Sequence, residues 1–208
     1  TFTYAASYTN FVYARIETSG VYLYRSANSA DLNNAYFELP KSYFVLLVSN
    51  IDNEFYKAQY KDIVGYVKKS EVSPVAEKPK KPYPDEVKFW TYSSDGTKIV
   101  TSTFESNNPQ GVGTVAVMQE LNYYGLMIGD EILKDRGYLW LYCKTENASG
   151  YLYAGLCNVS KNFKENDEVV TKISEPYLDG DDSFLYNLVS LSPALKIILV
   201  LLVTLPCF

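Results

Sequence analysis

The chain has 208 residues, which allows one large domain or two small ones, and its formal net charge is −5. This acidic balance argues against nucleic acid as a partner, because proteins that bind phosphate backbones carry a basic patch. The hydrophobic fraction of 47% is enough for a packed core. The sequence has no histidine, which removes the commonest general base and metal ligand. The 20 tyrosines favour strands over helices.

Strand patterns dominate the first part of the chain. Residues 1–9 form an N-terminal segment that lacks the basic and apolar regions of a signal peptide. Residues 20–25 then alternate in polarity, and residues 44–48 form a continuous apolar run. Residues 10–75 therefore predict one small all-β domain.

A stretch rich in proline and lysine, residues 76–85, follows this domain. Such a composition predicts an extended, solvated linker. The linker separates the first domain from a second part of similar length, residues 86–160, in which short strand patterns again alternate with turn residues. The sequence therefore predicts two β domains in tandem.

A repeated motif of strand, tight turn and strand links the two parts. Phe55 and Gly65 in the first part stand 85 residues before Trp140 and Gly150 in the second. The same offset places Cys143 at a position where the first part has a small core alanine. We therefore interpret residues 86–160 as a diverged second copy of the first domain.

The cysteines and the acidic residues indicate no catalytic or metal site. The 3 cysteines, Cys143, Cys157 and Cys207, include no C-x-x-C pair, so neither a disulfide framework nor a zinc site is expected. A bond between Cys143 and Cys157 outside the cell is the alternative to two buried thiols, which we favour. The carboxylates are scattered and no glycine-rich phosphate loop is present. We expect no enzyme activity, no metal and no cofactor.

The end of the chain differs in composition from the rest. Residues 161–192 are largely polar and predict a linker, and residues 193–208 are almost wholly apolar. A transmembrane helix needs about 20 apolar residues. We interpret residues 193–208 as a membrane-anchor helix that is cut short. The alternative is a buried C-terminal helix, although the run is apolar on every side and not on one face.

Five elements in the first part resemble the bacterial Src-homology-3-like domains. In order, they are residues 21–27 for the opening Leu-Asn-Val-Arg pattern, 37–43 for the Leu-Pro-Lys-Gly element, 44–48 for a Val-Leu strand, 55–58 for Trp-Tyr-Lys-Val and 65–67 for Gly-Trp-Val. The second part resembles the family less closely. Residues 126–132 stand at the Leu-Pro-Lys-Gly element, residues 138–142 and 150–152 match the last two elements, and residues 94–97 replace the Arg-Ser opening.

The resemblance implies two small β-barrels in tandem that are exposed outside the cell membrane. The apolar run at residues 193–208 predicts the single C-terminal span that tethers them. It implies binding of cell-wall peptides or of a surface protein through shallow aromatic grooves, since tyrosine offers a large rigid surface and a hydroxyl. The predicted ligand-binding residues are Tyr22, Tyr24, Arg25, Tyr43, Tyr56 and Tyr66.

Three alternatives remain open at this stage. Many tyrosine rings on strands only cover a barrel, so any one of them can be structural. The two domains can also serve as a spacer or an adhesive surface protein. Finally, they can be the targeting region of a cell-wall hydrolase whose catalytic domain lies outside this sequence.

Overall fold

The computed structural model describes residues 12–28, 30–85, 90–91, 97–117, 119, 121–158, 164–174, 176 and 178. These residues form strands that are joined by turns and by one-turn 3-10 helices, so the protein is all-β. The predicted N-terminal segment and membrane anchor lie outside the described residues. Within the described part of the chain, no helix has the length and apolar character needed to cross a membrane.

The first half of the molecule, residues 12–75, contains seven strands in the order β3-β2-β6-β5-β4-β1-β7. The strands are β1 (Val12–Ile16), β2 (Tyr22–Tyr24), β3 (Ala35–Glu38), β4 (Phe44–Asn50), β5 (Phe55–Tyr60), β6 (Ile63–Lys68) and β7 (Val72–Val75). Two 3-10 helices, η1 (Leu32–Asn34) and η2 (Lys69–Glu71), precede β3 and β7. Gly65 and Val67 of β6 are buried and their neighbours half-buried, which is the alternation expected when one face of a strand lies on a core.

The second half, residues 90–158, repeats this arrangement. Five of its strands are paired in the order β10-β9-β13-β12-β11, and β14 pairs with β8. The strands are β8 (Trp90–Thr91), β9 (Thr97–Val100), β10 (Gly111–Val115), β11 (Asn122–Ile128), β12 (Leu139–Lys144), β13 (Ser149–Tyr153) and β14 (Cys157–Asn158). The helices η3 (Glu105–Asn107) and η4 (Ala154–Leu156) precede β10 and β14, as η1 and η2 precede β3 and β7.

The register of the strand pairs repeats as well. Ala58 of β5 lies opposite Gly65 of β6, and Cys143 of β12 lies opposite Gly150 of β13. These are the residues that the 85-residue offset relates in the sequence. In both halves a bulge interrupts the preceding pair, between β4 and β5 and between β11 and β12. The repeat therefore extends beyond the motif that the sequence analysis found.

The structure moves two of the proposed sequence correspondences. Leu126 lies in β11 opposite Leu141, whereas the sequence analysis placed it at the Leu-Pro-Lys-Gly element, which in the first half ends before β4. The Arg-Ser opening has its counterpart directly after β9, because the backbone N–H of Thr101 donates to the carbonyl of Gln110 as that of Arg25 donates to the carbonyl of Asn34. The counterpart of this opening is thus Thr101-Ser102. Of residues 94–97, the structure describes only Thr97, the first residue of β9.

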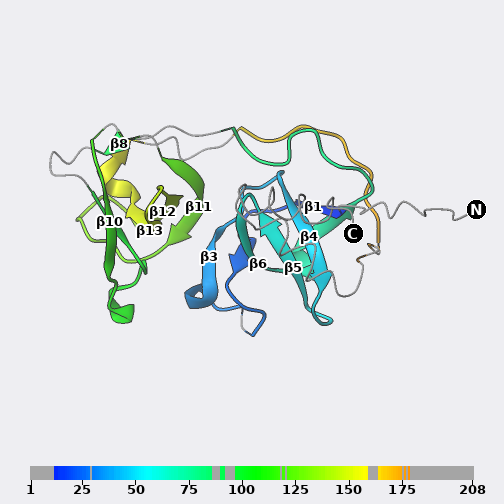
Figure 1. Cartoon of the computed structure of the whole chain (residues 1–208), viewed down its shortest axis with the longest axis horizontal. Helices are drawn as coiled ribbons and strands as arrows, with labels where there is room; N and C mark the ends of the chain where they lie inside the picture. The colour runs from blue at the N-terminus through cyan, green and yellow to red at the C-terminus, as the bar shows by residue number, and fades with distance from the viewer. Residues whose placement is uncertain are drawn as a thin grey trace, which may run out of the picture.

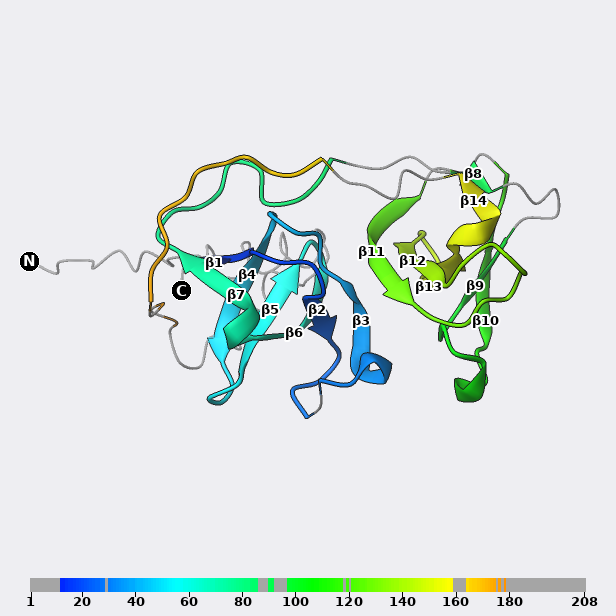
Figure 2. The same cartoon turned by 180° about the vertical axis from the view of Figure 1, so that it is seen from behind.

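The two halves pack against each other. Figures 1 and 2 show β3 of the first half beside β11 of the second, and one backbone pairing, Leu126 with Glu38, joins these strands. Phe37 is fully buried at this junction, with its ring 5.1 Å from that of Tyr142 and 6.1 Å from that of Tyr124. One hydrophobic cluster includes core residues of the first half and these tyrosines of the second. The sequence contained no signal for this contact.

A segment after the second half returns to the first. We call residues 164–174 the strap and residues 76–85 the connector; Figures 1 and 2 show them side by side, in orange and green. Arg15 of β1 donates from Nη1 to the carbonyl of Glu168 at 2.7 Å and from Nη2 to the carbonyl of Asn166 at 2.8 Å. The backbone N–H of Asn166 donates to Ser42 Oγ at 2.7 Å. The strap is therefore bound to the first half.

The strap also extends the sheet at β7. The N–H of Ala76 donates to the carbonyl of Thr171, and the N–H of Ile173 donates to the carbonyl of Pro74, both at 2.9 Å. The Glu168 carboxylate accepts hydrogen bonds from two backbone N–H groups of the connector. The stretch that the sequence predicted to be a polar linker thus covers, over residues 164–174, an edge of β7 that would otherwise be unpaired.

Candidate binding site between the two halves

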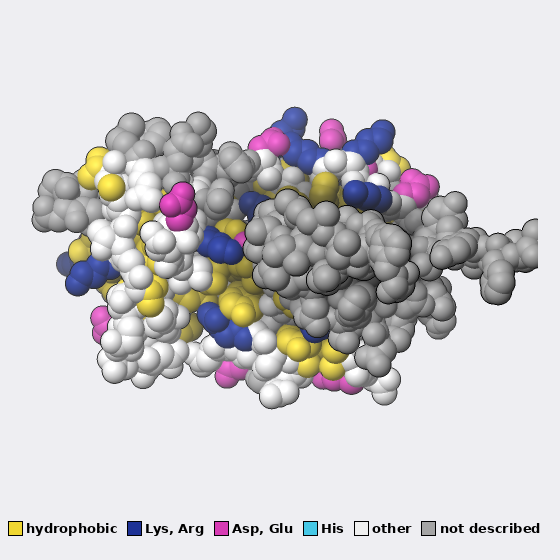
Figure 3. Space-filling view, viewed as in Figure 1, with side chains coloured by type: hydrophobic (Ala, Val, Ile, Leu, Met, Phe, Trp, Pro, Cys, Tyr) yellow, Lys and Arg dark blue, Asp and Glu magenta, His cyan; other side chains and the backbone are white. Residues whose placement is uncertain are grey.

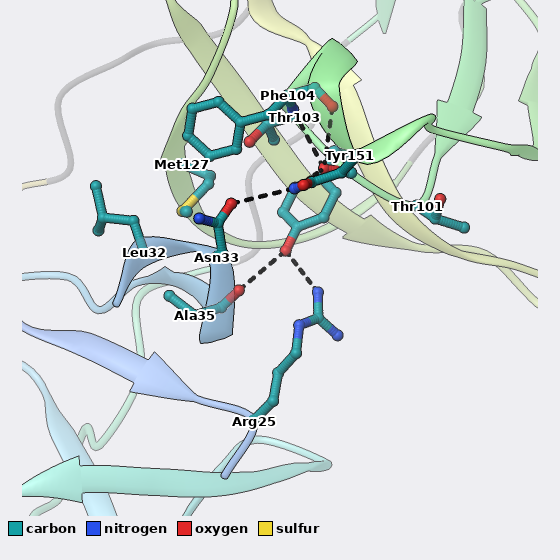
Figure 4. A pocket seen from close by; sticks show the side chains of 11 residues that line it. Arg25, Leu32, Asn33, Ala35, Thr101, Thr103, Phe104, Met127 and Tyr151 are labelled. Carbon is teal, nitrogen blue, oxygen red and sulfur yellow. Dashed lines mark hydrogen bonds between the residues drawn. The ribbon is translucent and has the colours of Figure 1, made fainter. Parts of the chain in front are cut away.

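A cavity of about 240 Å³ lies where the two halves meet. The loops that follow β2 and β9, which occupy equivalent places in the repeat, form much of its wall and carry η1 and η3 (Figure 4). The residues that matter for its chemistry are Arg25, Asn33, Thr101, Phe104, Met127 and Tyr151. Because both halves contribute, the cavity exists only when they are packed together.

Arg25 contributes the formal charge of the cavity lining. Its Nη2 donates to the hydroxyl of Tyr151 at 2.7 Å, and its guanidinium carbon lies 4.2 Å from the centre of the Tyr36 ring. This stacking and the hydrogen bond fix the plane of the guanidinium group. Among the described residues no carboxylate pairs with Arg25, so further N–H donors are available to a ligand.

Tyr151 holds Arg25 in place from the second half. Its hydroxyl donates to the carbonyl of Tyr36 at 2.9 Å, while it accepts the hydrogen bond from Arg25. Burial raises the pKa of Tyr151 to about 12, so the hydroxyl keeps its proton at neutral pH. Tyr151 of the second half therefore connects two groups of the first half, the Arg25 guanidinium and the backbone carbonyl of Tyr36.

Amide and hydroxyl groups make up the rest of the polar lining. Asn107 donates from Nδ2 to Oδ1 of Asn33 at 3.1 Å, which connects η3 of the second half to η1 of the first. None of the described residues that line the cavity is acidic. The Asp31 carboxylate accepts hydrogen bonds from Asn33 at the start of η1. The lining thus combines one positive charge with neutral polar groups.

A second cavity, of about 500 Å³, lies at the β4–β5 turn of the first half. Tyr56 and Lys69 line it, with the Lys69 ammonium 4.9 Å from the centre of the Tyr56 ring. Lys69 donates to the carbonyl of Asp52, and Asp52 accepts backbone hydrogen bonds from the turn. Those backbone hydrogen bonds hold the pKa of the Asp52 carboxyl below its usual value. The turn is therefore held by the Asp52 carboxylate and by Lys69 of η2.

The predicted ligand-binding residues are spread over four places, of which the position of Tyr43 beside the strap is one. Arg25 lines the cavity between the halves and Tyr56 lines the second one. Tyr24 and Tyr66 lie opposite each other in β2 and β6, and the ring of Tyr22 is 6.3 Å from that of Tyr24. This third group is an aromatic patch in which Tyr24 is buried and the other two rings are half-buried.

Tyr24 and Tyr43 have structural partners. Burial, with the neighbouring Glu71 and Tyr22, raises the pKa of Tyr24 to about 12. Its ring packs edge-on against Phe55 at 6.0 Å. Tyr43 is buried, and its hydroxyl donates to the carbonyl of Lys164 in the strap at 2.9 Å. The Tyr43 hydroxyl, which the sequence analysis predicted to bind a ligand, thus donates its hydrogen bond to the strap.

Asp62 connects the two halves on the side where Lys144 and Tyr124 approach it. The hydroxyl of Tyr124 donates to Oδ1 of Asp62 at 2.5 Å, and the ammonium of Lys144 forms an ion pair with its Oδ2. In Figure 3 hydrophobic side chains are gathered where the two groups of strands meet, with Lys and Arg side chains around them. Tyr124 of the second half therefore serves the packing of the two halves.

Asp62→Asn should remove a stabilisation that depends on pH. Burial raises the pKa of the Asp62 carboxyl, but the hydrogen bonds from Lys144 and Tyr124 outweigh it and lower the pKa below its ordinary value. The contribution to stability is therefore present above pH ~4, the pKa of an unfolded aspartate, and is lost as the pH falls through the lower folded pKa. Urea denaturation from pH 2 to 7 should show wild type and variant converging at acidic pH.

The control for this experiment is Asp135→Asn. The Asp135 carboxylate is exposed, and it forms no ion pair with the described residues. Its backbone φ of 63° is one that asparagine also adopts. A difference between wild type and Asp62→Asn that stays constant down to pH 2 would show that the Asp62 charge does not stabilise the junction.

The described thiols are buried and not bonded. Cys143 and Cys157 are free cysteines in the core of the second half, as the sequence favoured. Burial raises the pKa of each thiol to about 12. A thiol with such a pKa has almost no thiolate at neutral pH and is a poor nucleophile. The described residues also contain no group of three or more acidic or cysteine side chains placed to hold a metal ion.

Comparison with known proteins does not assign a function to the cavity between the halves. No protein-family model matches the chain. No curated protein matches it either. The function of the cavity between the halves must therefore be argued from the residues that line it.

Proposed function

We propose that this protein is a non-catalytic binding module in which each half forms a small Src-homology-3-like barrel. The observation that carries the proposal is Arg25, an exposed arginine that lines a polar cavity and has no carboxylate partner among the described residues. An oriented guanidinium with available donors is a binding group for anionic ligands. The ligands we propose are peptides of the cell wall or of a surface protein, bound outside a membrane to which the C-terminal segment tethers the chain.

Two features support this proposal. The strand order and register repeat in the two halves, as expected for a duplicated domain. The half-buried rings of Tyr22 and Tyr66 beside Tyr24 also give the first half an aromatic surface suited to a peptide.

Retention of the full chain on purified cell-wall sacculi tests the proposal. We expect wild-type protein to be retained and Arg25→Ala to lose most of that retention. Tyr56→Ala tests the second cavity in the same way. The control is Tyr138→Ala, because Tyr138 is 59% exposed and lines neither cavity.

The outcomes separate this function from that of a spacer. The spacer alternative is favoured by the packing of the halves and by the strap, which together hold the molecule in one shape. If wild-type protein is not retained at any salt concentration, cell-wall binding is wrong and the spacer is favoured. If Tyr138→Ala loses as much retention as Arg25→Ala, binding does not use the cavity.

A further inference from the structure

The lining of the cavity between the halves is chemically divided. Figure 4 shows Arg25 and the hydroxyl of Tyr151 on one side, and the side chains of Leu32, Phe104 and Met127 on the other. Met127 is buried and belongs to the core that the halves share. A ligand that fits this division has a negative group and a short apolar group next to it.

The single charge argues for a carboxylate. Arginine presents two parallel N–H donors to a planar carboxylate, and one guanidinium balances one negative charge. A phosphate carries nearly two charges at neutral pH and usually needs further cations or several backbone N–H groups. Among the described residues, the cavity lining contains no second lysine or arginine. The chemistry therefore matches a monoanion.

The size of the cavity limits the ligand. Pockets for drug-sized molecules span about 300–1,000 Å³, whereas this cavity has about 240 Å³. It can take a small carboxylic acid or the last residue of a longer chain. The Asn33–Asn107 pair beside it offers amide groups to a peptide bond.

On the basis of the proposed function, we propose that the cavity binds a free carboxylate that adjoins a short apolar side chain, as at the C-terminus of a peptide. The Arg25 guanidinium pairs with the carboxylate, and Leu32, Phe104 and Met127 surround the side chain. Because η1 and η3 both contribute to the lining, the bound ligand contacts the two halves together. Binding should therefore stabilise their junction.

The test uses the full chain and one peptide in two forms. The peptide is acetyl-Gly-Gly-Ala-Ala-Val, with a free carboxylate or with a C-terminal amide, titrated by calorimetry and by NMR. We expect the acid to bind at least about tenfold more tightly than the amide, because charge-assisted hydrogen bonds are lost in the amide. N-acetylvaline is the second ligand: binding as tight as that of the peptide would identify a site for small acids, and weaker binding would identify a peptide site.

Variants test the assignment to Arg25. Arg25→Gln should abolish the preference for the acid, and Arg25→Lys should retain only part of it, because lysine keeps the charge without the planar pair of donors. Arg136→Gln is the matched control, since Arg136 is an exposed arginine that does not line the cavity. Thermal denaturation of each variant checks that the fold is retained.

Three results would overturn the inference. One is equal affinity for acid and amide, and another is unchanged binding by Arg25→Gln. The third is displacement of the peptide by inorganic phosphate at lower concentration than by acetate, which would indicate a general oxyanion site. If neither peptide form binds while sacculi still retain the protein through Arg25, the carboxylate inference fails and the proposed function stands. If both experiments fail, both are wrong.

Discussion

Phe37→Ala should lower the free energy of unfolding by about 3–5 kcal/mol, the usual cost of truncating a buried phenylalanine. Phe37 has no exposed surface, and its ring packs against Tyr60, Tyr124 and Tyr142. These tyrosines come from both halves, so the cavity left by the substitution opens at their junction. Urea denaturation followed by circular dichroism measures the loss.

The same experiment tests whether the halves unfold together. Because the hydrophobic cluster around Phe37 spans both halves, we expect a single transition at a lower urea concentration. The control Tyr138→Ala should change stability by less than about 0.5 kcal/mol, as expected for an exposed residue. Two separate transitions, one of them at the wild-type midpoint, would show that the junction does not couple the halves.

Gly65→Ala and Gly150→Ala should destabilise the protein by similar amounts, about 1–3 kcal/mol or more. A Cβ at Gly65 would lie 2.5 Å from the carbonyl oxygen of Tyr24, and one at Gly150 would lie 2.5 Å from that of Val100. Both contacts are with the backbone of the neighbouring strand, which cannot move aside cheaply. Each kcal/mol should lower Tm by roughly 2–4 °C in a chain of this size.

Gly111→Ala is the matched control for these substitutions. Gly111 is also a strand glycine, but a Cβ there would have no atom within 4 Å. We expect its thermal denaturation to stay close to that of wild type. If Gly150→Ala were as stable as Gly111→Ala, the close approach of β13 to β9 would be wrong, and with it the equivalence of Gly65 and Gly150.

The all-β class and one part of the repeat could be predicted from local sequence patterns. The motif around Gly65 and Gly150 was visible because one offset of 85 residues, with no insertion, relates the β5–β6 register to the β12–β13 register. The rest of the repeat was hidden because the connections before these strands differ in length. The segment between β11 and β12 is longer than that between β4 and β5, so no constant offset links Leu47 to Tyr123, although both precede the bulge.

The site between the halves could be predicted only in part. Arg25 was found because its residue type after a strand pattern matched a family opening. Its setting depends on Tyr151, which is distant in the sequence and contacts it only through the packing of the two halves. No sequence pattern predicted that Asn33 and Asn107 belong to the site. Contacts between units depend on surface shape, which local periodicity does not encode.

The strap determines how a mechanical load would pass through the molecule. Val75 of β7 lies opposite Tyr13 of β1 on one side and pairs with Lys172 of the strap on the other. With strands spaced about 5 Å apart, the backbones at Tyr13 and Lys172 lie roughly 10 Å from each other. Tension applied between residues 12 and 174 would therefore be borne by β1, β7 and the strap, which lie side by side. The second half, which lies in the sequence between β7 and the strap, would remain unloaded.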